Sequence, residues 1–172
     1  MAARGWSHVG LSTLYLDKTR AFYEGVLGFP AVRCDILEFA EGGRIRHIFF
    51  DTGGGQLIAF MEPRDIPGFP LEYDAGINRG LGLPDAFYHF AFQVESQEAL
   101  DAKRAELIAK GVRVTPVVDH EWMHSIYFKD PNGVMLEYAW ACRALGPDDS
   151  VMQVRERLSL RARSPVTDFR DT

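Results

Sequence analysis

The chain has 172 residues, 47% of them hydrophobic and 25% charged, which is typical of a soluble globular protein large enough to bury a core. Its net charge of −5 argues against nucleic acid or an anionic membrane as the main partner. Apolar runs are shorter than the roughly 20 residues of a membrane span, and two cysteines are too few for a disulfide framework, so we expect a cytoplasmic protein.

The first part of the chain is predicted to form a strand, a helix and three further strands. The first strand begins near His8, and apolar residues then recur at helical spacing over residues 17–28, where Gly28 suits a C-terminal cap. Three strand-like runs follow, at 31–39, 44–51 and 56–61.

The same order of elements recurs in the second part. A strand begins near His89, and a helix follows over residues 96–111, with Ser96 as its N-cap. Three more strands are predicted at 112–118, 122–129 and 134–140. The chain therefore reads βαβββ twice, which predicts an α+β fold of two tandem modules.

We predict a single domain over residues 1–145, with modules at 5–62 and 86–142. The joining segment 63–85 is rich in glycine and proline, and it is either a lid or binding loop or a plain linker. The tail 146–172 carries apolar residues among charges, which indicates a C-terminal helix.

The segment Asp130-Pro131-Asn132-Gly133 predicts a tight hairpin turn with Gly133 in the left-handed region. A three-residue loop would place Tyr127 directly opposite Glu137, with both side chains on one face. A two-residue loop would put them on opposite faces. The alternative interpretation is an ordinary hairpin with a surface tyrosine and a solvated glutamate.

Two histidines favour the functional interpretation. His8 and His89 open the first strand of each repeat. A lone buried histidine is more often structural, but two histidines at equivalent positions favour a role as metal ligands. A buried carboxylate such as Glu137 also needs a partner cation. We therefore predict a metal site of His8, His89 and Glu137, and two imidazoles with one carboxylate suit Fe(II) as a facial triad.

This pattern resembles the vicinal oxygen chelate superfamily, which includes glyoxalase I, extradiol ring-cleavage dioxygenases, fosfomycin-resistance thiol transferases and bleomycin-binding proteins. The resemblance covers residues 5–142, and the stretch 118–137 is similar to the extradiol dioxygenase signature at every constrained position. It implies that the two modules form a curved mixed sheet around a metal-binding cavity, and that the protein is a metal-dependent enzyme and a homodimer.

Departures from the family pattern separate its members. Ala59 stands at the first-half position equivalent to Glu137, from which glyoxalase I takes a fourth ligand, and this weakens the glyoxalase interpretation. Fosfomycin enzymes need a cationic cluster that is not evident over 113–125, and bleomycin-binding proteins usually lack the triad. Extradiol dioxygenases carry a base histidine before the second metal histidine, whereas residues 62–88 contain none.

The favoured prediction is an Fe(II) extradiol-type dioxygenase that cleaves a catechol-like aromatic diol with O2. Tyr127 would take part in proton transfer, with His120 or His124 as the acid/base partner. The alternatives are a lyase, isomerase or thiol transferase that uses Mn(II), Ni(II) or Zn(II), and a non-catalytic binding or resistance protein.

Overall fold

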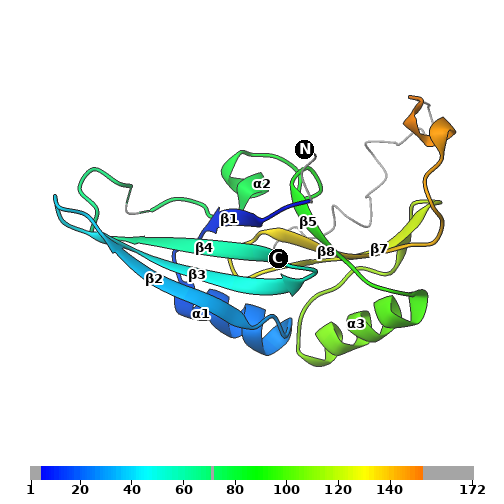
Figure 1. Cartoon of the computed structure of the whole chain (residues 1–172), viewed down its shortest axis with the longest axis horizontal. Helices are drawn as coiled ribbons and strands as arrows, with labels where there is room; N and C mark the ends of the chain where they lie inside the picture. The colour runs from blue at the N-terminus through cyan, green and yellow to red at the C-terminus, as the bar shows by residue number, and fades with distance from the viewer. Residues whose placement is uncertain (1–4, 71, 153–172) are drawn as a thin grey trace. The chain divides into compact units, whose positions relative to one another are not determined.

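A computed structural model describes residues 5–70 and 72–152 of the chain. The chain divides into two compact units: unit 1 is Met1–Gly82 with Asp130–Val134, and unit 2 is Leu83–Lys129 with Met135–Thr172. Each unit contains one four-stranded mixed sheet, so the predicted α+β class is confirmed (Figure 1). The part of the predicted C-terminal helix beyond residue 152 lies outside the described residues. In the part of the chain that is described, no helix is long and apolar enough to cross a membrane.

Unit 1 contains sheet 1, in the order β1-β4-β3-β2. Strand β1 pairs with β4 in parallel, and the other neighbours are antiparallel. The strands are β1 (His8–Ser12), β2 (Ala31–Glu38), β3 (Arg44–Gly53) and β4 (Gln56–Arg64). Between β1 and β2 the chain forms α1 (Leu16–Arg20), which continues as a π-helical segment, η1 (Ala21–Val26).

Aromatic side chains form the core of unit 1 between η1 and sheet 1. Tyr23 is fully buried, and its ring centroid lies 5.2 Å from that of Phe50 and 4.8 Å from that of Phe60. Burial of large aromatic side chains of this kind contributes strongly to stability. Because side chains alternate along a strand, residues such as His8 and Phe49 lie on the opposite face of sheet 1.

A buried carboxylate joins the start of α1 to sheet 1. The Glu62 side chain is fully buried and accepts hydrogen bonds from the Leu16 amide at 3.0 Å, Arg46 Nε at 2.5 Å and an Arg64 guanidinium nitrogen at 2.7 Å. Burial alone would raise the pKa of Glu62, but these hydrogen bonds hold its pKa below the usual value. Glu62 is therefore charged at neutral pH, with its partners in place.

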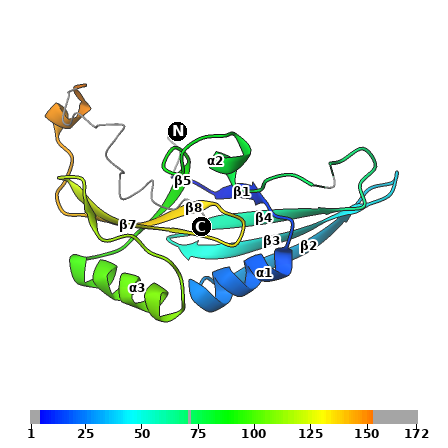
Figure 2. The same ribbon diagram turned by 180° about the vertical axis from the view of Figure 1, so that it is seen from behind.

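Unit 2 contains sheet 2, in the order β5-β8-β7-β6, with β5 and β8 parallel. The strands are β5 (His89–Gln93), β6 (Val118–Asp119), β7 (Met123–Lys129) and β8 (Met135–Ala141). Helix α3 (Gln97–Ala109) lies along one face of sheet 2 (Figures 1 and 2). The Ser96 hydroxyl accepts a hydrogen bond from the Ala99 amide at 3.2 Å, so the predicted N-cap is confirmed. A short 3-10 turn, η2 (Pro147–Ser150), follows β8.

Two segments differ from the predicted elements. The predicted strand 112–118 is wrong, because only an isolated bridge from Val114 to Phe128 and the first residue of β6 pair there. Pro116 has no amide proton for a ladder hydrogen bond, which accounts for the irregular backbone. Within the segment expected to be irregular, the structure has a short helix, α2 (Ile77–Gly80).

The hairpin turn forms as its sequence predicts. The Asp130 carboxylate accepts hydrogen bonds from the Asn132 amide at 2.8 Å and the Val134 amide at 2.9 Å, and Gly133 has a φ of +82°. In sheet 2, Tyr127 pairs directly with Glu137. The predicted register is therefore confirmed, and both side chains lie on the face away from α3.

Candidate metal centre

Three of the predicted side chains share one face of sheet 2, which we call the site face. On β5 and β8 the parallel register pairs His89 with Met135 and Ala91 with Glu137, and on β7 Tyr127 stands opposite Glu137. Because alternate residues of a strand point to the same side, His89, Tyr127 and Glu137 all project from the side opposite α3.

The central contact of the site face joins His89 and Glu137. The Glu137 side chain is 1% exposed, and its Oε2 lies 3.1 Å from Nε2 of His89. The other ring nitrogen, Nδ1, lies 3.0 Å from the carbonyl oxygen of Ala86, which fixes the orientation of the imidazole. The hydrogen bond to Glu137 is the main reason that the pKa of His89 is raised.

The second carboxylate oxygen of Glu137 is a candidate position for a cation. Its Oε1 is buried and makes no hydrogen bond within the described part of the protein. An incompletely paired carboxylate in a buried position is costly, and a cation offsets that cost. The donor set, an imidazole nitrogen held by a backbone carbonyl and a carboxylate, suits a divalent transition metal.

Unit 2 by itself offers two candidate ligands, His89 and Glu137. Among the residues described in either unit, no three His, Cys, Asp or Glu side chains form a cluster that could hold a metal ion. A site with three protein ligands therefore needs a donor in addition to His89 and Glu137.

Tyr127 and His120 form a second pair on the site face. The Tyr127 side chain is 5% exposed, and its hydroxyl lies 2.9 Å from Nε2 of His120. Burial, and then the negative charge of Glu137, raise the pKa of Tyr127 to about 12. The tyrosine ring also packs edge-on against His89, with centroids 6.0 Å apart. The phenol is therefore a protonated hydroxyl, positioned beside both His89 and Glu137.

His124 lies on the other side of sheet 2. It pairs with Trp140, its ring contacts the Trp140 ring at 5.5 Å, and its Nδ1 lies 2.5 Å from Oε1 of Gln97 at the start of α3. The sheet separates this histidine from Tyr127. Of the two histidines weighed from the sequence, only His120 contacts the tyrosine, and counting alternation along β7 could have separated them.

The registers of the two sheets place His8 and His89 at matching positions. In sheet 1, His8 pairs with Leu57 and Gly10 with Ala59, as His89 pairs with Met135 and Ala91 with Glu137 in sheet 2. Ala59 thus stands where the second repeat has its carboxylate. Locally, the Nδ1 of His8 lies 3.2 Å from the Ser7 hydroxyl, and its ring packs edge-on against Phe49.

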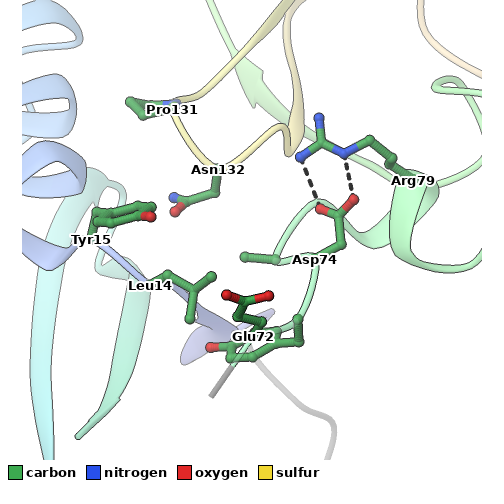
Figure 3. A pocket seen from close by; sticks show the side chains of 9 residues that line it. Leu14, Tyr15, Glu72, Asp74, Arg79, Pro131 and Asn132 are labelled. Atoms are coloured by element: carbon green, nitrogen blue, oxygen red, sulfur yellow. Dashed lines mark hydrogen bonds and ion pairs between the residues drawn. The ribbon is translucent and has the colours of Figure 1, made fainter. Parts of the chain in front are cut away.

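Unit 1 also has a pocket of about 450 Å³, which the sequence did not predict (Figure 3). Asp74 and Arg79 form a two-point ion pair at its rim, and the Tyr73 hydroxyl donates to the Thr13 carbonyl at 3.4 Å. The lining residues are Leu14, Tyr15, Glu72, Tyr73, Asp74, Ala75, Arg79, Pro131 and Asn132. None of the predicted site residues lines this pocket. Part of the segment 63–85 lines it, and whether this segment is a binding loop or a linker stays a prediction.

Comparison with known proteins identifies the family. The model of the Glyoxalase/Bleomycin resistance protein/Dioxygenase superfamily matches residues 5–138, so the chain belongs to that superfamily. A relative from Bacillus subtilis (strain 168), named "Putative ring-cleaving dioxygenase MhqA", is 22% identical over 157 residues, which make up 91% of this chain and 46% of the relative. The chain thus spans about half the length of that relative.

Solved structures share the fold. An integron cassette protein from the mobile metagenome of the Halifax Harbour sewage outfall is 26% identical, with a TM-score of 0.55 over 80% of this chain and 99% of that one. The fosfomycin resistance protein FosX from Listeria monocytogenes is 22% identical, with a TM-score of 0.56 over 87% of this chain and 100% of that one. At this identity, the likeness to FosX shows the fold alone.

Proposed function

We propose that the protein is an Fe(II)-dependent extradiol-type dioxygenase that cleaves a catechol-like diol with O2. The observation that carries the proposal is the state of Glu137. Its carboxylate is buried, one oxygen faces His89, the other has no hydrogen-bond partner among the described residues, and a positioned phenol stands directly opposite. This is the arrangement expected of a metal-binding carboxylate next to a substrate-binding group.

In this proposal, His89 Nε2 and Glu137 are two of the metal ligands. The Ala86 carbonyl holds the imidazole by its other nitrogen, which keeps Nε2 directed towards the carboxylate. The third ligand is taken to be His8, which is a prediction from its matching position in the sequence repeat and in the register of sheet 1. Fe(II) held there would supply Lewis acidity to a bound diol and a place for its reaction with O2.

The chain's own residues then have distinct roles. The Tyr127 hydroxyl donates a hydrogen bond to a substrate oxygen and thereby orients the diol. His120, 2.9 Å from that hydroxyl, accepts or returns a proton through it. His124 has no part in this proposal because it faces α3. The burial of Tyr127 and Glu137 keeps water away from both groups.

The choice of ring cleavage rests on two supports. The stretch 118–137 is similar to the extradiol dioxygenase signature, and the chain is similar, at 22% identity, to a protein named as a ring-cleaving dioxygenase. Because the chain spans about half of that relative, the ring-cleavage reaction and the aromatic diol substrate are proposals for this chain and are not assigned from the relative.

The test is O2 uptake by anaerobically Fe(II)-loaded protein with a panel of substituted catechols, read together with the yellow ring-fission product. Uptake with colour would support the proposal. Bound Fe(II) without uptake would overturn ring cleavage and leave the non-oxidative alternatives, a lyase, isomerase or thiol transferase.

A further inference from the structure

Strand β2 is an exposed edge with apolar side chains. Within the described residues it pairs with β3 alone, and it forms the outer edge of sheet 1 (Figures 1 and 2). Its exposed hydrophobic residues include Val32 at 54%, Ile36 at 63% and Leu37 at 49%. A long edge strand with exposed apolar side chains can add a further strand from another chain, and such edges are normally protected.

We propose that this edge binds a second copy of the same chain, with the two β2 strands antiparallel about a two-fold axis at Cys34. The argument comes from the order of charges on the strand. Arg33 and Asp35 flank Cys34, and they share a face of sheet 1 because Arg33 pairs with Phe49 and Asp35 with His47 on β3. Within the strand, Arg33 Nε lies 2.7 Å from Asp35 Oδ2, and because the two side chains are 69% and 27% exposed, both can exchange this ion pair for one with a neighbouring strand.

The charges select one register. Residues that lie directly opposite each other in an antiparallel pair point to the same face of the sheet. In a symmetric β2–β2 pair, the two-fold axis must therefore pass between a residue and the same residue of the other copy. An axis at Arg33 would oppose two arginines, and an axis at Asp35 would oppose two aspartates. An axis at Cys34 places Arg33 of each copy opposite Asp35 of the other, which makes two attractive cross-strand pairs. The strand is therefore complementary to itself in this register and repulsive in the two adjacent ones.

The regular part of this pairing is short. A β-bulge lies between Ala31 and Arg33, so the ladder covers residues 33–35, and beyond it Ile36 and Leu37 of each copy pack against the start of the other strand. Cys34 is exposed and stands opposite itself at the axis. Opposed residues in an antiparallel pair have Cα atoms about 4.5–5.5 Å apart, which is within the range of a disulfide.

Thiol crosslinking of the full-length chain tests the position of the axis. Diamide, which takes up the two hydrogens that two thiols lose, should give a covalent dimer of Cys142→Ser, in which Cys34 is the remaining cysteine. The variant Cys34→Ser should stay monomeric on a non-reducing gel. Failure of Cys142→Ser to crosslink while the protein is dimeric in solution would overturn the proposed axis.

Charge reversal tests the register by analytical ultracentrifugation. Arg33→Asp and Asp35→Arg should each weaken dimerisation by about tenfold, because both symmetric pairs become repulsive. The double variant should regain wild-type dimerisation. Asp101→Lys, which reverses an exposed charge on α3, is the matched control and should change nothing. Monomers at every concentration, or a dimer indifferent to the β2 charges, would overturn the proposal, and thermal melting confirms that each variant is folded.

Discussion

Replacing Glu62 with glutamine should cost stability, because it removes the charge from a fully buried hydrogen-bond network. Glutamine has nearly the same volume and can still accept the Leu16 amide. It loses the charge-assisted hydrogen bond from Arg46, whose side chain is 29% exposed, and such a bond is worth about 1.5–3 kcal/mol. Arg64 is 45% exposed, so its share is discounted to less than about 1 kcal/mol. We expect a loss of about 1.5–4 kcal/mol in the free energy of unfolding.

Urea denaturation measures this loss, and Glu24→Gln is the matched control. Glu24 pairs with Arg20 on the surface, where such a pair contributes about 0.5 kcal/mol. If Glu62→Gln were no more destabilised than Glu24→Gln, the buried network would not hold α1 to sheet 1, and the reasoning would fail.

The same network predicts how the stability loss depends on pH. The pKa of Glu62 is held below its unfolded value of 4.5, so the stability that its charge contributes is fully present above that pH. This contribution is lost as the pH falls through the lower folded pKa. The difference in unfolding free energy between the wild type and Glu62→Gln should therefore be constant from neutral pH to about pH 5.5, and should shrink below pH 4.5.

Three further predictions concern the site face and the hairpin. Tyr127→Phe should keep the bound metal and lose at least about tenfold in kcat, and an unchanged kcat would remove the phenol from the mechanism. His120→Ala should also lower kcat by at least about tenfold, whereas His124→Ala should stay within about twofold, and equal losses in the two variants would contradict the assignment of faces. Gly133→Ala should destabilise the fold by about 1–2 kcal/mol, because φ is +82° and a Cβ there would meet an arginine guanidinium at 3.2 Å. Gly25→Ala, with open space around its Cβ, is the control in the same denaturation assay, and a matching change in both glycine variants would count against the strained-turn argument.

The site face was predictable where local turn chemistry decides the register. Asp130-Pro131-Asn132-Gly133 specifies a three-residue loop, and that alone places Tyr127 opposite Glu137. Alternation along β7 distinguishes His124 from His120. His124 is an odd number of positions from Tyr127, so their side chains lie on opposite faces of sheet 2.

Other features depend on contacts between residues that are distant in sequence. Nothing local to Glu62 indicates that the Leu16 amide and Arg46 will surround it, so this buried network could not be predicted from the sequence. The predicted strand at 112–118 followed β propensity, and the missing amide of Pro116 outweighed it. Helix α2 has only four residues, too few for a periodic pattern.

The central claim is that Glu137 and His89 bind a metal ion, and the most direct measurement is the stoichiometry of Fe(II) binding by anaerobic titration calorimetry. We predict one equivalent for the wild type and loss of tight binding in His8→Ala, His89→Ala and Glu137→Gln. Glu62→Gln, which alters a buried carboxylate in the other unit, should still bind one equivalent. Stoichiometric, undiminished binding by Glu137→Gln would contradict the account.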